Sequence, residues 1–218
     1  MTAPGPVSVA LQRAAVLERE GRRDVALQLL RAAAAGSHAD AGGPRSLAQA
    51  AMRLGDPAMA IDQMQSALGL EPDDPELRFQ FACLLAHEGR NAEATNHFRQ
   101  CVERAPRNFQ AWHLMGLALQ RQGLHGDALR ALRQASALAP GNPRVLEALA
   151  ESEFHAGYPE DALPLWQELF AARPDDATVI LRTSETLNRL GRHGEALAML
   201  REATRREPAA REISRGLA

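Results

Sequence analysis

The residue types that most often carry chemistry are present in this chain but scattered. No two histidines have the His-Glu-x-x-His spacing of a zinc site, and the cysteines, Cys83 and Cys101, form no cluster with a histidine. The sequence also lacks a Gly-x-Ser-x-Gly nucleophile elbow and a glycine-rich phosphate loop. We therefore expect no enzymatic activity, no bound metal and no cofactor. The seven histidines are His38, His87, His97, His113, His125, His155 and His193.

The charged residues argue against further classes of function. All 25 basic residues are arginine, so a P-loop lysine, a Schiff-base lysine and a lysine general base are excluded. A net charge of -2 argues against a protein that binds nucleic acid by neutralising phosphates. The amino-terminal residues do not follow the order of a secretory signal peptide, and no apolar run approaches membrane-spanning length. With two isolated cysteines as apolar fillers, these features predict a bacterial cytoplasmic protein without a membrane or nucleic-acid partner.

Glycine and proline recur in this sequence with a shared period of 34 residues. Such a period is typical of stacked units of supersecondary structure. The glycine suits a left-handed position just after a first helix, and the proline, 17 residues later, ends a second helix. Each period therefore predicts two helices. The glycines are Gly21, Gly55, Gly89, Gly123, Gly157 and Gly191, and the prolines are Pro72, Pro106, Pro140, Pro174 and Pro208.

Side-chain size repeats with the same period. Small side chains allow two helices to approach closely, whereas large apolar side chains fill the space between neighbouring helices. One small column is Ala26, Ala60, Ala94, Ala128, Ala162 and Ala196, and a second is Ala14, Ala48, Ala82, Gly116, Ala150 and Ser184. The large column is Leu30, Met64, Phe98, Leu132, Trp166 and Leu200.

These columns resemble the signature of the tetratricopeptide repeat (TPR) family over residues 7–210. In residues 109–142 the signature positions hold Trp112, Met115, Gly116, Leu119, Gly123, Ala128, Leu132, Ala135 and Pro140. The resemblance implies an all-α fold, a right-handed α-solenoid of stacked antiparallel helix pairs, with a concave groove lined by the first helix of each pair. It also implies that Trp112 is a packing residue rather than the lid of a ligand pocket.

The predicted organisation is a tail (1–6), a degenerate first repeat (7–40), five further repeats and a partial capping helix (211–218). The further repeats are 41–74, 75–108, 109–142, 143–176 and 177–210. The glycine-rich segment 32–46 predicts that the first helix of the second repeat starts late, near Pro44.

Arg13, Arg78 and Glu153 stand where the family is usually apolar. Arg13 lies in the first repeat, at the edge of the array, where we expect its side chain to be exposed to water. We expect Glu153 either to pair with an arginine of an adjacent helix or to help bind a ligand from the groove.

The groove implied by the resemblance can be read by register. One column is basic or titratable in every repeat: Arg19, Arg53, His87, Arg121, His155 and Arg189. Neighbouring columns place Phe79, Leu117 and Phe154 as apolar anchors, and we expect these three to form one continuous strip. The candidate binding residues are Phe79, Cys83, His87, His113, Leu117, Gln120, Arg121, Glu147, Glu151, Phe154, His155 and Arg189. Alternatively, the basic column is merely solvated at helix C-termini, where the dipole favours it.

The leading hypothesis is a non-enzymatic scaffold that binds a peptide or protein segment in this groove. The ligand is predicted to be acidic near repeats two to four and neutral or basic near repeats five and six. A carboxylate clamp and an asparagine ladder of the family are not expected, because the lysines and asparagines they require are absent. Two alternatives stay open: a substrate-recruiting module of a larger bacterial enzyme of the sulfotransferase, glycosyltransferase or oxygenase type, and a homo-oligomeric array that associates through its exposed C-terminal helix.

Overall fold

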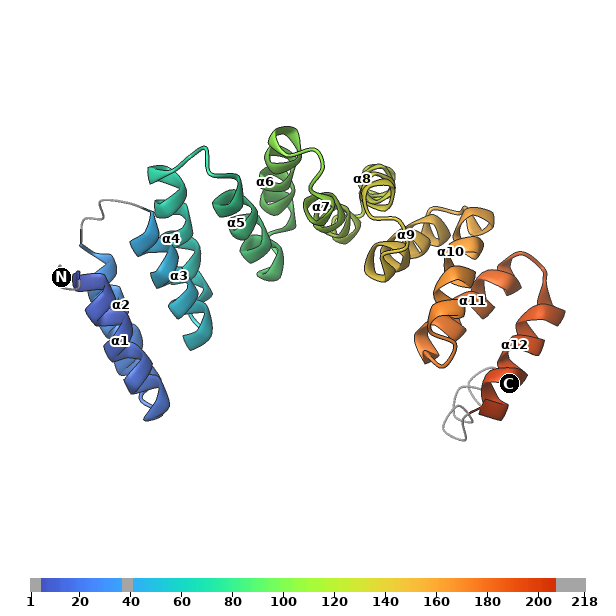
Figure 1. The fold of residues 1–218 in the computed structure, drawn as a ribbon, viewed down its shortest axis with the longest axis horizontal. Coiled ribbons are helices and arrows are strands. Elements are labelled where there is room, and N and C mark those ends of the chain that lie inside the picture. Colours follow the sequence, from blue (N-terminus) through green and yellow to red (C-terminus); the bar gives the residue numbers. More distant parts are fainter. Residues whose placement is uncertain (1–4, 37–40, 207–218) are drawn as a thin grey trace. The chain divides into compact units, whose positions relative to one another are not determined.

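The computed structural model describes residues 5–36 and 41–206. These residues contain twelve α-helices and no strand, and the helices follow one another as six pairs (Figure 1). The chain divides into two compact units, Met1–Ala105 and Pro106–Ala218, here called the N-terminal half and the C-terminal half. The predicted helix end at Pro208 and the predicted capping helix at 211–218 lie outside the described residues.

The N-terminal half holds three helix pairs. The two helices of a pair pack on each other, and successive pairs meet where α2 contacts α3, where α1 contacts α3 and where α4 contacts α5. The helices are α1 (Pro6–Arg19), α2 (Arg23–Ala34), α3 (Gly42–Leu54), α4 (Pro57–Leu70), α5 (Pro75–His87) and α6 (Asn91–Arg104).

The C-terminal half repeats this plan with three more pairs. Successive pairs meet where α8 and α7 contact α9 and where α10 contacts α11. The helices are α7 (Phe109–Arg121), α8 (His125–Leu138), α9 (Pro143–His155), α10 (Pro159–Ala172), α11 (Ala177–Arg189) and α12 (His193–Arg206).

Glycines end the first helices as predicted, and polar side chains cap the start of several helices. All six glycines of the 34-residue series have a positive φ, which confirms their left-handed conformation. At Gly55, φ is 81°, and the next N–H, that of Asp56, donates to the Ala51 carbonyl at 2.9 Å, which closes the end of α3. Five N-cap side chains accept hydrogen bonds from backbone N–H groups of the first turn; they are Asp56, Asp74, Asn108, Asn142 and Asp176.

The alanine column from Ala26 to Ala196 is buried, as expected for residues between closely packed helices. Every alanine from Ala26 to Ala196 in that column is at most 2% exposed. In the second small column, a Cβ atom added at Gly116 would lie 2.6 Å from Cγ of Leu132. No side chain fits between α7 and α8 at this point.

Two sequence expectations about the helices need correction. Helix α3 starts at Gly42 rather than near Pro44. Pro44 falls in the first turn, where the backbone N–H has no partner within the helix, so proline does not delay the helix. In the large column, five members are buried but Leu200 in α12 is only half-buried.

Within the described part of the chain, no helix combines the length and the apolar character that crossing a membrane requires.

Candidate binding surface

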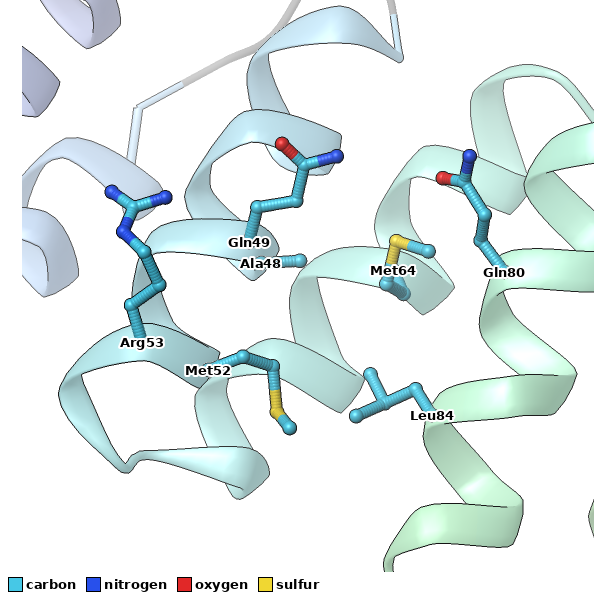
Figure 2. Close-up of a pocket in the computed structure, with 7 residues that line it drawn as sticks. All are labelled: Ala48, Gln49, Met52, Arg53, Met64, Gln80 and Leu84. Atoms are coloured by element: carbon cyan, nitrogen blue, oxygen red, sulfur yellow. The ribbon is translucent and has the colours of Figure 1, made fainter.

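In the N-terminal half, the first helices of the second and third pairs frame an open pocket of about 450 Å³. Figure 2 shows the side chains of α3 on one side, those of α5 on the other, and Met64 of α4 between them. We call this the α3–α5 pocket. It is lined by Ala48, Gln49, Met52, Arg53, Met64, Gln80 and Leu84.

The α3–α5 pocket has apolar walls and a polar rim. Met64 and Leu84 are buried and Met52 is half-buried, whereas Gln49 and Arg53 are exposed. The Nε atom of Arg53 lies 3.9 Å from Oε2 of Glu18, at the limit of an ion pair. The pocket can therefore take apolar groups and offers hydrogen-bond donors at its edge.

In the C-terminal half, α7 and α9 frame a second pocket, of about 380 Å³, here called the α7–α9 pocket. It brings together five of the twelve candidate residues: His113, Leu117, Gln120, Glu147 and Glu151. Arg144 and Ala148 complete the lining, so groups of both charges surround it. Burial and the nearby Arg144 guanidinium hold the pKa of His113 below its usual range.

Three of these five residues are engaged by the protein itself. The Gln120 amide donates to the Ser152 hydroxyl and, at 3.3 Å, to the Ala148 carbonyl, so it ties α7 to α9. Arg173 donates to Glu147 at 3.0 Å, and Nε of Arg182 lies 2.8 Å from Glu151. The carboxylates are therefore paired with arginines that the groove prediction did not include.

Phe154, His155 and Arg189 form a second group of candidate residues. The guanidinium of Arg189 lies over the Phe154 ring, 4.8 Å from its centroid, and the His155 ring meets that ring edge-on at 5.6 Å. Phe154 is half-buried against the core around Trp166, while His155 and Arg189 are exposed. The stacking holds a cation beside an apolar ring at the surface.

The remaining candidates lie apart from these groups. Phe79 packs edge-on against Phe98 at 5.9 Å, and exposed His87 has Nδ1 2.8 Å from Oε1 of Glu88. Arg121 is exposed at the end of α7. The strip of Phe79, Leu117 and Phe154 draws on both halves and stays a prediction.

Cys83 is half-buried in α5. Burial, together with the nearby Cys101 and Glu76, raises the pKa of its thiol to about 11. At neutral pH the group is therefore a thiol and a poor nucleophile.

Two of the three unusual polar residues, Glu153 and Arg78, have structural partners. Arg133 of α8 pairs with Glu153 of α9 at 2.7 Å, which confirms the structural alternative for Glu153. Buried Arg78 donates to Oε1 of Gln100 and to the Pro72 carbonyl, and Arg13 is exposed. In the described ranges, no group of three or more histidine, cysteine, aspartate or glutamate side chains could hold a metal ion.

The twelve candidates do not include any residue that lines the α3–α5 pocket. The sequence does hold the signal that identifies it, because Gln49, Met52 and Arg53 precede Leu117, Gln120 and Arg121 by two 34-residue periods. Arg144 was also missed, since no column of the groove contains it.

Comparison with known families identifies the class of protein. Two family models described as "Tetratricopeptide repeat" match, one over residues 85–151 and the other over residues 45–109 and 148–210. The chain therefore belongs to the tetratricopeptide repeat family.

Solved structures agree on the fold. The structure titled "MamA RS-1 ArsTM double mutant" has a TM-score of 0.72 at 21% identity, covering 78% of this chain and 96% of that one. The structure of PilW, described as a type IV pilus biogenesis factor, has a TM-score of 0.70 at 20% identity, covering 99% of this chain and 100% of that one. At these identities the likeness shows the shared array of stacked helix pairs.

A curated relative matches a short segment only. The cytochrome c-type biogenesis protein CycH of Rhizobium meliloti (strain 1021) is 45% identical over 49 residues. The match covers 22% of this chain and 13% of that protein.

Proposed function

We propose that this protein is a non-enzymatic scaffold that binds a segment of a partner protein on the shared face of its first helices. One observation carries the proposal: both halves hold an open pocket between successive first helices, α3 and α5 in one and α7 and α9 in the other. The pockets lie at the same register, since Gln49 and Met52 correspond to Leu117 and Gln120. Solenoid proteins build extended binding surfaces by this kind of repetition.

The chemistry of the surface supports binding rather than catalysis. Apolar side chains next to a few polar groups suit peptide recognition. Three of the candidate residues are poorly suited to act as a nucleophile or general acid, because burial raises the pKa of the Cys83 thiol to about 11 and Glu147 and Glu151 are paired with arginines. PilW and CycH are both named as biogenesis factors, which supports a role in assembling other proteins. The two free cysteines, Cys83 and Cys101, support a cytoplasmic location.

The test is a paired charge reversal, Arg121→Glu with His155→Glu, measured by titration calorimetry against the best partner recovered by pulldown and mass spectrometry. We expect the affinity to fall at least tenfold and to fall further with added salt, since exposed charges are screened. Arg130→Glu on second helix α8, where the side chain is 81% exposed, is the control. If the control weakens binding and the double variant does not, the partner uses the second helices and the proposal is wrong.

Self-association through the last helix is a second candidate, favoured by Leu197 of α12, which is 49% exposed. Sedimentation velocity at two concentrations tests it. A concentration-dependent dimer that Leu197→Gln abolishes supports self-association through α12, and a monomer at both concentrations rejects it.

A further inference from the structure

The α3–α5 and α7–α9 pockets share a register but differ in the chemistry of their walls. Met52 and Leu84 of the first correspond to Gln120 and Ser152 of the second, two 34-residue periods later. Gln120 and Ser152 are hydrogen-bonded to each other, so polar atoms tie α7 to α9. Met52 and Leu84 can form no such bond. The α3–α5 pocket therefore keeps apolar walls that face open space.

The size of the α3–α5 pocket sets what it can hold. A cavity of about 150 Å³ holds one benzene ring, and the α3–α5 pocket, with about 450 Å³, is three times larger. Two large apolar side chains therefore fit. Met52 and Met64 contribute flexible thioether side chains that adapt to different shapes. Figure 2 shows both methionines and Leu84 in the space between α3 and α5.

Charge at the rim selects the rest of the ligand. Arg53 stands at the α3 rim with 56% of its side chain exposed and only a 3.9 Å approach to Glu18. On the α5 rim, Gln80 already donates to Glu76 at 2.9 Å. A carboxylate on the ligand is thus favoured beside α3.

We propose that the α3–α5 pocket anchors two neighbouring large apolar side chains of a partner segment, with an Asp or Glu beside them that pairs with Arg53. This inference rests on the proposed function and names the anchor and the ligand chemistry within it. The α7–α9 pocket, in which Gln120 and Ser152 are hydrogen-bonded to each other, is not assigned an apolar anchor.

The test begins with a phage-displayed library of random twelve-residue peptides, panned on the parent protein. Enriched peptides are synthesised with a fluorescein label, and their affinities are measured by fluorescence anisotropy. We expect the enriched peptides to share two neighbouring large apolar residues next to Asp or Glu. Met52→Gln introduces the residue type that Gln120 supplies at the same position of the α7–α9 pocket. We expect it to weaken binding at least tenfold. Arg53→Glu is expected to do the same, and a peptide with Lys in place of its acid should bind that variant better than the original peptide does.

Leu70→Gln is the matched control, because Leu70 is an exposed apolar residue of α4 in the same half. We expect it to change the affinity less than twofold. Thermal melts followed by circular dichroism verify that each variant is folded; Met52 is half-buried and Gln is similar in size, so Met52→Gln should fold.

The outcomes separate this inference from the proposed function. If Met52→Gln and Arg53→Glu bind like the parent while the Arg121→Glu and His155→Glu pair loses binding, the anchor assignment is overturned and the scaffold function stands. If neither set of variants weakens binding, or if panning yields no peptide that binds, both are overturned.

Discussion

Arg133 of α8 and Glu153 of α9 form an ion pair that joins one helix pair to the next, with Nη2 and Oε1 2.7 Å apart. The two ends of the pair differ in environment, since the side chain of Glu153 is 3% exposed and that of Arg133 is 56% exposed. Oε2 of Glu153 is buried without a hydrogen-bond partner in the described structure. The carboxylate therefore depends on a single guanidinium for its compensation.

Removing that guanidinium should be costly. We expect Arg133→Met to lower the free energy of unfolding by about 2–3 kcal/mol, below the full cost of breaking a buried pair because Arg133 is partly solvated. The double variant Arg133→Met with Glu153→Met should recover most of this loss, since no buried charge remains. Urea denaturation gives both values. Arg130→Met, which removes an exposed pair with Asp127 on the same helix, should cost no more than ~1 kcal/mol; a similar cost at both sites would contradict the prediction.

Adding one methyl group at Gly116 should destabilise the contact between α7 and α8. The new Cβ would lie 2.6 Å from Cγ and 2.8 Å from Cδ2 of Leu132, so the helices must separate or Leu132 must move. We expect Gly116→Ala to cost roughly 1–3 kcal/mol from overpacking, although alanine favours helix more than glycine does. Thermal melts measure the loss, and Leu132→Val in the same chain should relieve part of it. Gly126→Ala in α8 is the control, because no atom lies within 4 Å of its added Cβ. A Gly116→Ala variant as stable as Gly126→Ala would show that the helices have room.

Two histidines should make stability fall as the solution is acidified. Burial and the Arg78 guanidinium hold the pKa of His97 below its ordinary value of 6.5, with Glu93 acting in the opposite direction. Burial and Arg144 do the same for His113, and a hydrogen bond to the Arg144 backbone opposes them. Both side chains are neutral in the native state at pH values where the unfolded chain binds protons. The contribution of these two histidines to the free energy of unfolding is therefore complete above about pH 6.5. It is lost as the pH falls toward the pKa values of the native state.

The measurement is the free energy of unfolding in urea between about pH 7.5 and pH 5.5, a range above the titration of most carboxylates. We expect the parent to lose stability across this range. His97→Gln and His113→Gln should each flatten the dependence, and the double variant should flatten it most. An unchanged slope in the double variant would show that other groups are responsible.

Asp74 should contribute mainly as the N-cap of α5. Its Oδ1 accepts from the N–H groups of Glu76 and Leu77 at 2.9 and 3.1 Å, and its Oδ2 accepts from Arg45 at 2.9 Å. Asp74→Ala removes the cap and the ion pair and should cost about 1–2 kcal/mol. Asp74→Asn keeps a cap acceptor and should cost less than ~1 kcal/mol, the usual value of a solvated pair. Equal losses in urea denaturation would assign the stabilisation to Arg45 instead.

The fold could be predicted closely from the sequence because its signals are local and steric. Gly123 adopts φ of 74° and Ala128 is fully buried, as their columns indicated. A left-handed helix end and a close helix contact each restrict the residue type at one position, and the 34-residue period repeats that restriction along the chain. The start of α3 was predicted too late because proline is tolerated at any position of a first turn. Pro44 therefore does not show which residue begins the helix.

The candidate surface could be predicted only in part. Register correctly placed His113, Leu117 and Glu151 around one pocket, because a helix fixes which side chains share a face. It could not tell that Glu147 would be occupied by Arg173, which comes from 26 residues further along the chain. Arginine side chains are long enough to reach several carboxylates, so sequence spacing does not select the partner. Arg53 of the α3–α5 pocket stands in the predicted basic column, but no residue of this pocket was a candidate, because its walls are methionine and leucine, which also fill ordinary cores.

The ties between successive helix pairs, such as Arg133 with Glu153 and Arg182 with Glu151, are made by guanidinium groups in a chain without lysine. A guanidinium keeps its proton far into the alkaline range, where a lysine amine has lost its own. These contacts should therefore outlast the ionisation of the Cys83 thiol at a pKa of about 11. These 218 residues contain no lysine amine, so reagents that acylate amines would leave the guanidinium groups of Arg19 and Arg53 charged.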